Sequence, residues 1–415
     1  MKAAVLLLAG FALLLPGALQ AQRTDLPPAA KVIEALDNHP VVSAAAARVM
    51  SARAHGDMLR KGSQEVTVEG SYVRRSVDRE GDFDEFDATI SRPFRLPGKA
   101  ALDRKAGVLG VEVAENLMAD ARHQTALQFS DLWHDWLTAG SLHRNDLDTV
   151  SALDAALTAL ERRVALRDAA ALDIDQATAA LAQAQAQAAS SLAAREQARV
   201  TISAHFPEIP LPPEPPELPA PELPAQGLAA MRDRVIEHSH EIAAAEREAQ
   251  RLGVVAQRVK ADRIADPSFG VRLFSERSGM EQGAGVVASI PLGGGYRRAA
   301  TDQASAEAHA ARLDLAHTVR AITAIADADL SNARTRLEAW QQAQVSAQSA
   351  SDAIRRTARG YELGQIDLSD LLYARRQAND TRRSEIEARS EANRALLKLQ
   401  IDSHSIWSAE HAQYP

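Results

Sequence analysis

Four short stretches of the chain alternate between apolar and polar residues, which is the period of a β-strand whose two faces meet different surroundings. In QEVTVEGSY, Val66, Val68 and Tyr72 share one face, whereas Thr67 and Glu69 share the other. The alternation predicts strands near residues 64–75, 84–94, 267–276 and 283–291. Such strands fit a transmembrane barrel or a soluble sheet over a core. Because four strands cannot close a barrel and isolated hairpins are marginal in water, we expect strands from several chains to combine.

Elsewhere the apolar residues recur every three or four positions, the period of a coiled-coil helix. One such seam begins at Leu315 and passes through Ile322 and Leu330. Two long tracts without proline, 98–206 and 292–414, carry these helices. A helix over the first part of either tract would measure roughly 100 Å at about 1.5 Å per residue, which far exceeds the roughly 30 Å of a bilayer core. We therefore expect the helices to cross an aqueous space.

The two halves of the chain repeat the same features at nearly constant spacing. RVALRDAAALDIDQA in the first half aligns with GYELGQIDLSDLLYA in the second, and this pairs Asp173 with Asp370, 197 positions apart. Pro93 lies at the end of the second predicted strand and Pro291 at the end of the fourth, 198 positions apart. Two landmarks with nearly the same offset indicate an internal duplication, in which each half has a strand pair and a helical hairpin.

Proline and the first residues divide the chain further. Nine of the eighteen prolines lie in HFPEIPLPPEPPELPAPELPAQG, which cannot continue a helix and predicts an extended spacer. At the start, Lys2, an apolar run and the breaker Pro16 predict a secretory signal peptide cleaved after Ala21, with no cysteine there to accept a lipid anchor. The predicted division is a signal peptide at 1–21, a first repeat at 22–206 with strands at 64–94 and a helical tip near 167–175, a linker at 207–226, and a second repeat at 227–415 with strands at 267–291 and a tip near 360–372.

Composition agrees with long helices. The chain has 415 residues, no cysteine, 46% hydrophobic residues, only 4% aromatic residues and a formal net charge of −8. Few aromatic and many alanine residues favour closely packed helices over a conventional α/β core. The acidic balance argues against nucleic acid as a partner. The lack of cysteine excludes disulfides and thiolate metal sites.

Together these features resemble the TolC family of outer-membrane efflux channels over essentially the whole mature chain. The resemblance rests on LDNHPVVSAAAARV, on the strand-to-helix junctions ISRPFRLPGK and SIPLGGGYRRA, and on the corners LDIDQATAAL and GYELGQIDLSDLL. It implies a mainly α fold with a small β part, in which a homotrimer combines four strands per chain into a twelve-stranded transmembrane β-barrel. It also implies a long coiled-coil helical barrel through the periplasm. The junction residues that would bend the chain from strand into helix are Pro93, Gly98, Pro291, Gly293, Gly294 and Gly295.

The resemblance places both corners at the periplasmic tip, where the tunnel narrows and meets its partner. Asp173 and Asp370 over three subunits would put six carboxylates around one opening, and such a ring attracts cations. Tyr361, Gly364 and Asp367 complete the candidate aperture. An aspartate just after a turn is equally typical of a helix cap, so both interpretations stay open.

This chain departs from the family pattern at the tip. Arg167 stands in the first corner where Gly364 stands in the second, so the two turns need not be identical. Ile366 and Tyr373 replace residues that are charged in some members, which makes the family's closing network doubtful here.

Several residues suggest other chemistry without supporting it. His238 and His240 would face opposite ways on a helix, and His134, between two tryptophans, fits a helix interface better than a metal site. The GGG at residues 293–295 lacks the Lys-Ser/Thr of a phosphate loop. Because no nucleophile elbow or HExxH motif is present, we expect neither an enzyme, a cofactor nor a bound metal.

The sequence therefore predicts an outer-membrane channel of a tripartite efflux system, working with a periplasmic adaptor and an inner-membrane pump. Similarity of RLPGK and of FGVRLFSERSGMEQGAGVVASIPL to channels paired with heavy-metal RND pumps favours metal cations as cargo. Drug or solute efflux and type I secretion are alternatives. A periplasmic adaptor or coiled-coil scaffold is a further alternative, although an adaptor should have one helical hairpin flanked by β domains, not two in tandem.

Overall fold

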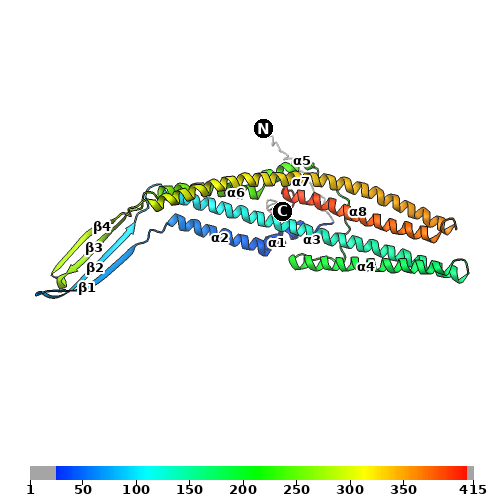
Figure 1. Cartoon of the computed structure of the whole chain (residues 1–415), viewed down its shortest axis with the longest axis horizontal. Coiled ribbons are helices and arrows are strands. Elements are labelled where there is room, and N and C mark those ends of the chain that lie inside the picture. Colours follow the sequence, from blue (N-terminus) through cyan, green and yellow to red (C-terminus); the bar gives the residue numbers. More distant parts are fainter. Residues whose placement is uncertain (1–24, 409–415) are drawn as a thin grey trace, which may run out of the picture.

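The computed structural model describes residues 25–408, so the predicted signal peptide lies outside the described part of the chain. The molecule is long and narrow, with a β-sheet at one end and two helical turns at the other (Figure 1). The helices are α1 (Ala29–Asn38), α2 (Pro40–Lys61), α3 (Lys99–Ala165), α4 (Ala171–His205), α5 (Leu228–Glu237), α6 (His240–Ala261), α7 (Gly295–Glu362) and α8 (Leu368–Asp402). None of them combines the length and the apolar character that a membrane-crossing helix needs, among the residues that the structure describes.

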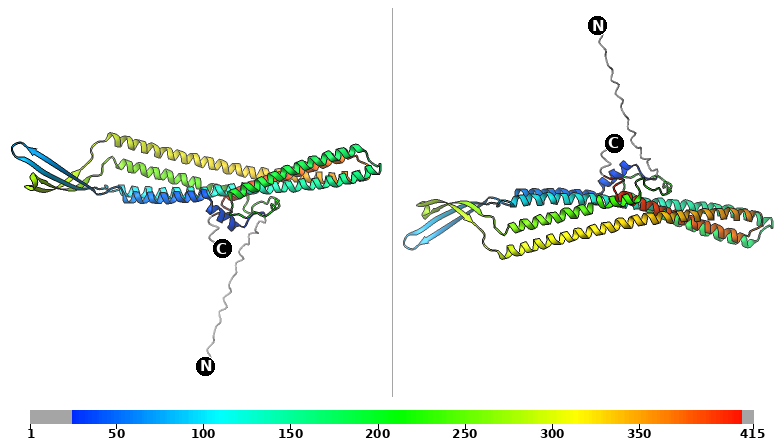
Figure 2. Two further views of the ribbon diagram at one scale, coloured as in Figure 1. Left: turned by 90° about the horizontal axis from the view of Figure 1, so that it is seen from below. Right: turned by 90° about the horizontal axis from the view of Figure 1, so that it is seen from above.

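Two helices of 67 and 68 residues, α3 and α7, run most of the length of the molecule. The shorter helices α2 and α6 lie beside them toward the sheet, and α4 and α8 lie beside them toward the opposite end (Figure 1, Figure 2). Each of α3 and α7 thus forms one helical hairpin, with α4 and α8 respectively. Two hairpins in tandem are the arrangement that the sequence repeat predicts.

The sheet contains four antiparallel strands in chain order: β1 (Thr67–Val77), β2 (Gly81–Pro93), β3 (Ser268–Glu276) and β4 (Glu281–Ser289). The register aligns Val68, Ile90, Val271 and Val286 in one row across all four strands. The predicted alternation is therefore confirmed along this row, whose residues lie on one face of the sheet, although Phe274 and Val287 lie on the other face. The predicted strand ends at residues 75 and 84 are wrong by two and three residues: strand pairing reaches Val77 and Gly81, and only residues 78–80 make the turn.

The main hydrophobic core lies midway along the molecule, where α1, α3, α8 and the segment after α4 meet. Phe129, Trp133 and Trp136 of α3 are buried there with Phe206 and Trp407. Three of the chain's four tryptophans lie in this core.

The proline-rich segment crosses this core in extended form between α4 and α5. Its apolar residues Ile209 and Leu218 are buried. Arg144 of α3 donates to the Pro215 carbonyl (2.9 Å) and Arg389 of α8 donates to the Leu218 carbonyl (3.1 Å). The segment therefore packs across both helical hairpins and holds them together, besides connecting them.

A group of charged residues joins the sheet to the helices. Asp103 of α3 accepts hydrogen bonds from Arg95 (3.0 Å) and from Arg258 of α6 (2.7 Å). Lys99, only 2% exposed, donates to Asp266, just before β3, at 2.8 Å. These ion pairs fix the angle at which the strands leave the helical part of the molecule.

The predicted junction residues lie in the two short connections between strand and helix. Pro93 is the last residue of β2, and Gly98, with φ of 90°, immediately precedes α3. Pro291 follows β4, Gly293 has φ of 131°, and α7 begins at Gly295. The glycine conformations at Gly98 and Gly293 are ones that other residues rarely adopt.

Candidate functional site

The two helical corners lie together at the end of the molecule opposite the sheet (Figure 1). In the first corner α3 ends at residue 165 and α4 begins at 171, and in the second α7 ends at 362 and α8 begins at 368. Both bounds are displaced by the same 197 positions as the paired aspartates. Leu160 and Ala177 of the first hairpin pack on Leu368 and Leu371 of the second, so one small core unites the corners.

The two corners have the same backbone turn, although their sequences differ. Arg167 and Gly364 both have left-handed φ angles, 62° and 69°. In each corner, the residue after the left-handed one donates its N–H to the carbonyl five residues earlier. Asp168 donates to Arg163 at 2.8 Å, and Gln365 donates to Gly360 at 2.9 Å. These are the bonds of a Schellman motif. The two turns, which the sequence left free to differ, are therefore alike, because the capping bonds impose one geometry on either residue.

The aspartates of the two corners are used differently. The Asp173 carboxylate accepts a hydrogen bond from the Ala170 N–H at 3.3 Å, so it caps the start of α4. In the second corner Asp367 precedes α8, and its carboxylate accepts from the Asp370 N–H at 2.9 Å. Because Asp367 does the capping there, the exposed Asp370 side chain is not required for this cap. Of the predicted aperture pair, Asp370 is thus the carboxylate that is exposed and not used in a cap.

An arginine that the sequence pattern did not single out connects the corners. The guanidinium of Arg163, in the last turn of α3, lies over the ring of Tyr361 in α7, 5.3 Å from its centroid. Its Nε also donates to Asp168 at 2.9 Å. A cation over an aromatic face is attracted by about 0.5–1 kcal/mol at an exposed site. The contact joins the first hairpin to the second at the tip, in place of a charged pair at Ile366 or Tyr373.

Ile366, the first departure from the family pattern, has a packing role. A Cβ on Gly360 would lie 2.5 Å from the Ile366 Cδ1 atom, so this glycine makes room for the isoleucine inside the second corner. Tyr373, the second departure, is 64% exposed. It lines a groove of about 550 Å³ between α4 and α8, together with amide and arginine side chains such as Gln183 and Arg375.

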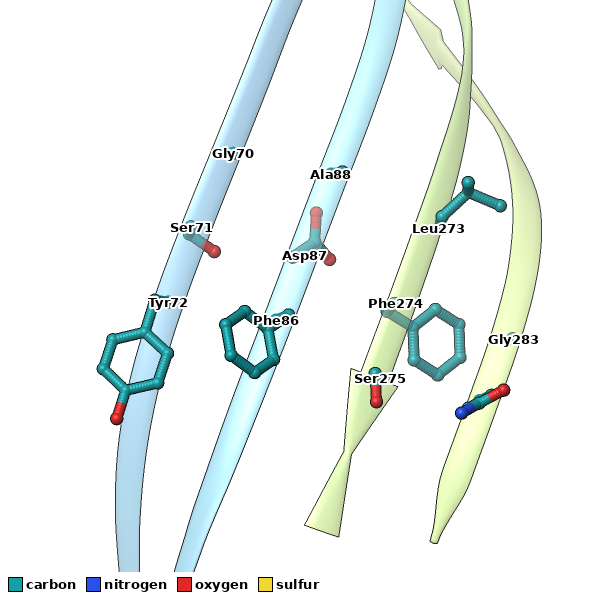
Figure 3. Close-up of a pocket in the computed structure, with 11 residues that line it drawn as sticks. Gly70, Ser71, Tyr72, Phe86, Asp87, Ala88, Leu273, Phe274, Ser275 and Gly283 are labelled. Carbon is teal, nitrogen blue, oxygen red and sulfur yellow. The ribbon is translucent and has the colours of Figure 1, made fainter. Parts of the chain in front are cut away.

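At the other end of the molecule, the sheet exposes its apolar face. Val68, Ile90 and Val271 are each more than half exposed, and Val286 is 84% exposed. Further along the strands, the rings of Tyr72 and Phe86 lie side by side, 5.2 Å apart (Figure 3). The opposite face carries charged residues, including the ion pair between Asp87 and Arg272.

The sheet also has two free edges. In the strand order β1–β2–β3–β4, the outer sides of β1 and β4 have no strand partner among residues 25–408. Unpaired strand edges and an apolar face exposed to solvent are both unfavourable for an isolated sheet in water. The described chain therefore presents a sheet that further strands and an apolar medium would complete.

Two predictions about histidines have different outcomes. His134 is fully buried with its Nδ1 2.9 Å from the Ser130 carbonyl, in keeping with the predicted packing role. The expectation that His238 and His240 face opposite ways on one helix is wrong, because α5 ends before His238 and α6 begins at His240. Both rings instead lie near His404. In the described part of the chain, no three metal-ligating side chains are arranged to hold a metal ion.

Comparison with known proteins gives a consistent result for the fold. No protein-family model and no curated protein matches the sequence. The outer-membrane channel OprN is similar in structure, with a TM-score of 0.78, 20% identity, and coverage of 92% of this chain and 91% of that one. VceC, an outer membrane protein of Vibrio cholerae, has a TM-score of 0.72 at 17% identity, with 90% and 95% covered.

The MtrE outer membrane channel of Neisseria gonorrhoeae, in its open state, also has a TM-score of 0.72, at 16% identity, with 90% and 88% covered. These similarities extend over the strands and both helical hairpins, since about nine-tenths of each chain is matched. The chain therefore has the fold of TolC-like outer-membrane channels.

Proposed function

We propose that this protein is the outer-membrane channel of a tripartite efflux system and acts as a homotrimer. The open four-stranded sheet is the main observation in support of this proposal. If β1 of one copy pairs with β4 of the next, three copies close a barrel of twelve strands. Its apolar face would meet lipid and its charged face the lumen. Strands of 9 to 13 residues suit this role, since a tilted membrane strand needs about 9–11.

In this arrangement α3 and α7 extend from the outer membrane into the periplasm. The corners then form the end that meets a periplasmic adaptor and an inner-membrane pump of the RND type. The groove beside Tyr373 offers polar and apolar side chains to such a partner. The chain itself conducts passively and is not an enzyme, and the pump supplies the energy.

We assign metal cations as the cargo, on the chemistry of the corners. Asp370 and Asp173, repeated in three copies, would gather negative charge at the narrow end of the tunnel. Such a ring attracts cations, and multivalent cations can bridge its carboxylates. Drug or solute efflux uses the same architecture without requiring this charge.

Planar-bilayer recording tests the conduction and the cargo separately. The purified protein should form pores without nucleotide or a proton gradient, and it should run as a heat-sensitive trimer on gels. A protein that stays monomeric and gives no conductance would rule out the channel.

Asp370→Asn should lower the selectivity for cations and weaken block by divalent cations from the tip side. Asp173→Asn is the matched variant: an asparagine can still accept the Ala170 N–H, so the cap of α4 should stay largely intact. Because the Asp173 carboxylate is engaged in that cap, its loss should change selectivity less. If both variants keep full selectivity and block, the aspartates serve only as caps and the assignment of metal cations loses its support.

A further inference from the structure

Four histidines that are distant in the sequence meet near the middle of the molecule. The ring of His404, just beyond α8, is stacked on His240 at 4.6 Å between centroids. The rings of His123 in α3 and His238 at the end of α5 lie 5.8 and 6.1 Å from it. Three separate segments therefore contribute to one histidine cluster: α3, the corner between α5 and α6, and the end of α8.

The backbone places two of these rings in unusual positions. His404 has a left-handed φ of 55°, and the N–H of Ser405 after it donates to the Gln400 carbonyl at 2.8 Å. Glycine or asparagine normally occupies such a position, because other residues are strained there. His240 is the first residue of α6, where a positive charge would oppose the helix dipole. The start of α6 thus favours a neutral His240 ring, and the turn at His404 does not require histidine.

The charged groups around the cluster do not balance a proton on every ring. Asp402 lies 3.0 Å from the His123 Nε2 atom, but it already accepts from Lys398 at 2.6 Å. The charged groups that face the cluster are Asp120 and Arg122 of α3, Glu241 of α6, Asp329 of α7, and Lys398 and Asp402 of α8. Four protonated rings would therefore add more positive charge than this surrounding can neutralise.

We propose that the histidine cluster is a proton-sensitive joint, which holds the α5–α6 corner on the end of α8 at neutral pH and loosens on acidification. The proposal concerns the architecture of the chain and does not depend on which cargo it conducts. It also explains why histidine occupies the strained position after α8. A glycine there would make the same turn without responding to protons.

The pH range in which the joint loosens follows from the lowered pKa values of two histidines. Burial, helped by the neighbouring imidazoles, lowers the pKa of His404 from 6.5 to about 4, and burial also lowers the pKa of His240. When the joint opens, a ring regains its ordinary pKa and binds a proton that the packed ring does not. The packed state is therefore fully stable above about pH 6.5 and loses stability as the pH falls toward 4.

Hydrogen exchange of the full-length protein in detergent, with EDTA present, tests this joint. The amides of Ile242 and Ser405 report on its two sides, since they donate to the Ser239 hydroxyl and the Gln400 carbonyl. After correction for intrinsic exchange rates, the equilibrium constant for opening should increase by up to about twentyfold between pH 7 and 5. This upper limit applies if His404 binds a proton only in the open state. The His404→Asn variant keeps the left-handed turn and should lose most of this dependence.

His55→Gln, an exposed histidine in α2, should leave the pH dependence unchanged. His240→Gln should reduce it, which keeps the test valid if the Asn variant folds poorly. Equal pH dependence in wild type and both cluster variants would overturn the proposal. It is also overturned if the wild-type dependence disappears in EDTA and returns with Zn²⁺, because the cluster would then be a metal site.

Discussion

The strained arginine of the first corner allows a direct test of how the two turns are built. Arg167 adopts φ of 62°, whereas its counterpart in the second corner is Gly364 at 69°. The left-handed conformation costs an L-residue about 1–2 kcal/mol, and glycine avoids this cost. Glycine also gains entropy in the unfolded chain, worth about 0.5–1 kcal/mol in the opposite direction. We therefore expect Arg167→Gly to stabilise the first corner by about 0.5–1 kcal/mol.

The expected gain can be measured at a single amide. The Asp168 N–H closes the turn by donating to the Arg163 carbonyl, and it exchanges with solvent only when the turn opens. A gain of about 0.5–1 kcal/mol should slow its exchange by about two- to fivefold, since about 1.4 kcal/mol corresponds to a factor of ten. Hydrogen-exchange mass spectrometry of peptides spanning the corner can resolve this change.

The second corner provides the matched control. A Cβ on Gly364 would meet no atom within 4 Å, so Gly364→Ala adds backbone strain without a clash. This variant should destabilise its turn by about 1 kcal/mol and speed exchange of the Gln365 amide about fivefold. If Arg167→Gly speeds exchange at Asp168, or if Gly364→Ala has no effect, the two turns do not share the strain that their φ angles indicate.

Three further variants test the rest of the structure. Asp103→Leu removes the carboxylate that Arg95 and Arg258 share at the sheet junction, which leaves Arg95 without a carboxylate and Arg258 with Asp262 alone, and it should cost about 3–5 kcal/mol in thermal or denaturant unfolding. Asp57→Leu, in an exposed pair, should cost at most about 1 kcal/mol. Val68→Arg on the apolar face should cost about 2–4 kcal/mol in a membrane-folding assay, and Thr67→Arg on the other face much less; equal tolerance would refute the assignment of faces. Gly107→Ala places a Cβ 2.9 Å from a Cα of α2, and this overpacking should destabilise the helices by about 1–3 kcal/mol and so lower the melting temperature. An unchanged melting temperature would show that this helix contact can relax.

Much of the fold follows from local patterns in the sequence. Strand alternation gives the correct faces because a β-strand has a period of two, so Val68 and Ile90 fall in one row once the turn is placed. The helical hairpins follow from apolar spacing and from the long intervals without proline. The strand ends were less predictable, since the charged residues near the first turn continue the pairing as far as Val77 and Gly81.

Contacts between distant segments could not be predicted in this way. Nothing local indicates that His404 lies on His240, or that the Arg163 guanidinium covers the Tyr361 ring, because each pair is brought together by packing of separate helices. The same holds for Lys99, whose burial depends on carboxylates that follow α6.

The duplication explains both the similarity of the corners and their different chemistry. Backbone capping depends on hydrogen bonds that many residues can satisfy, so the turn is the same with arginine or glycine in its left-handed position. Side-chain roles could diverge within this shared turn. Ala170 cannot cap α4, and Asp173 supplies the bond, whereas Asp367 caps α8 and frees Asp370 from that requirement. One corner therefore uses its aspartate for helix stability, and the other can present its aspartate to the space beyond the tip.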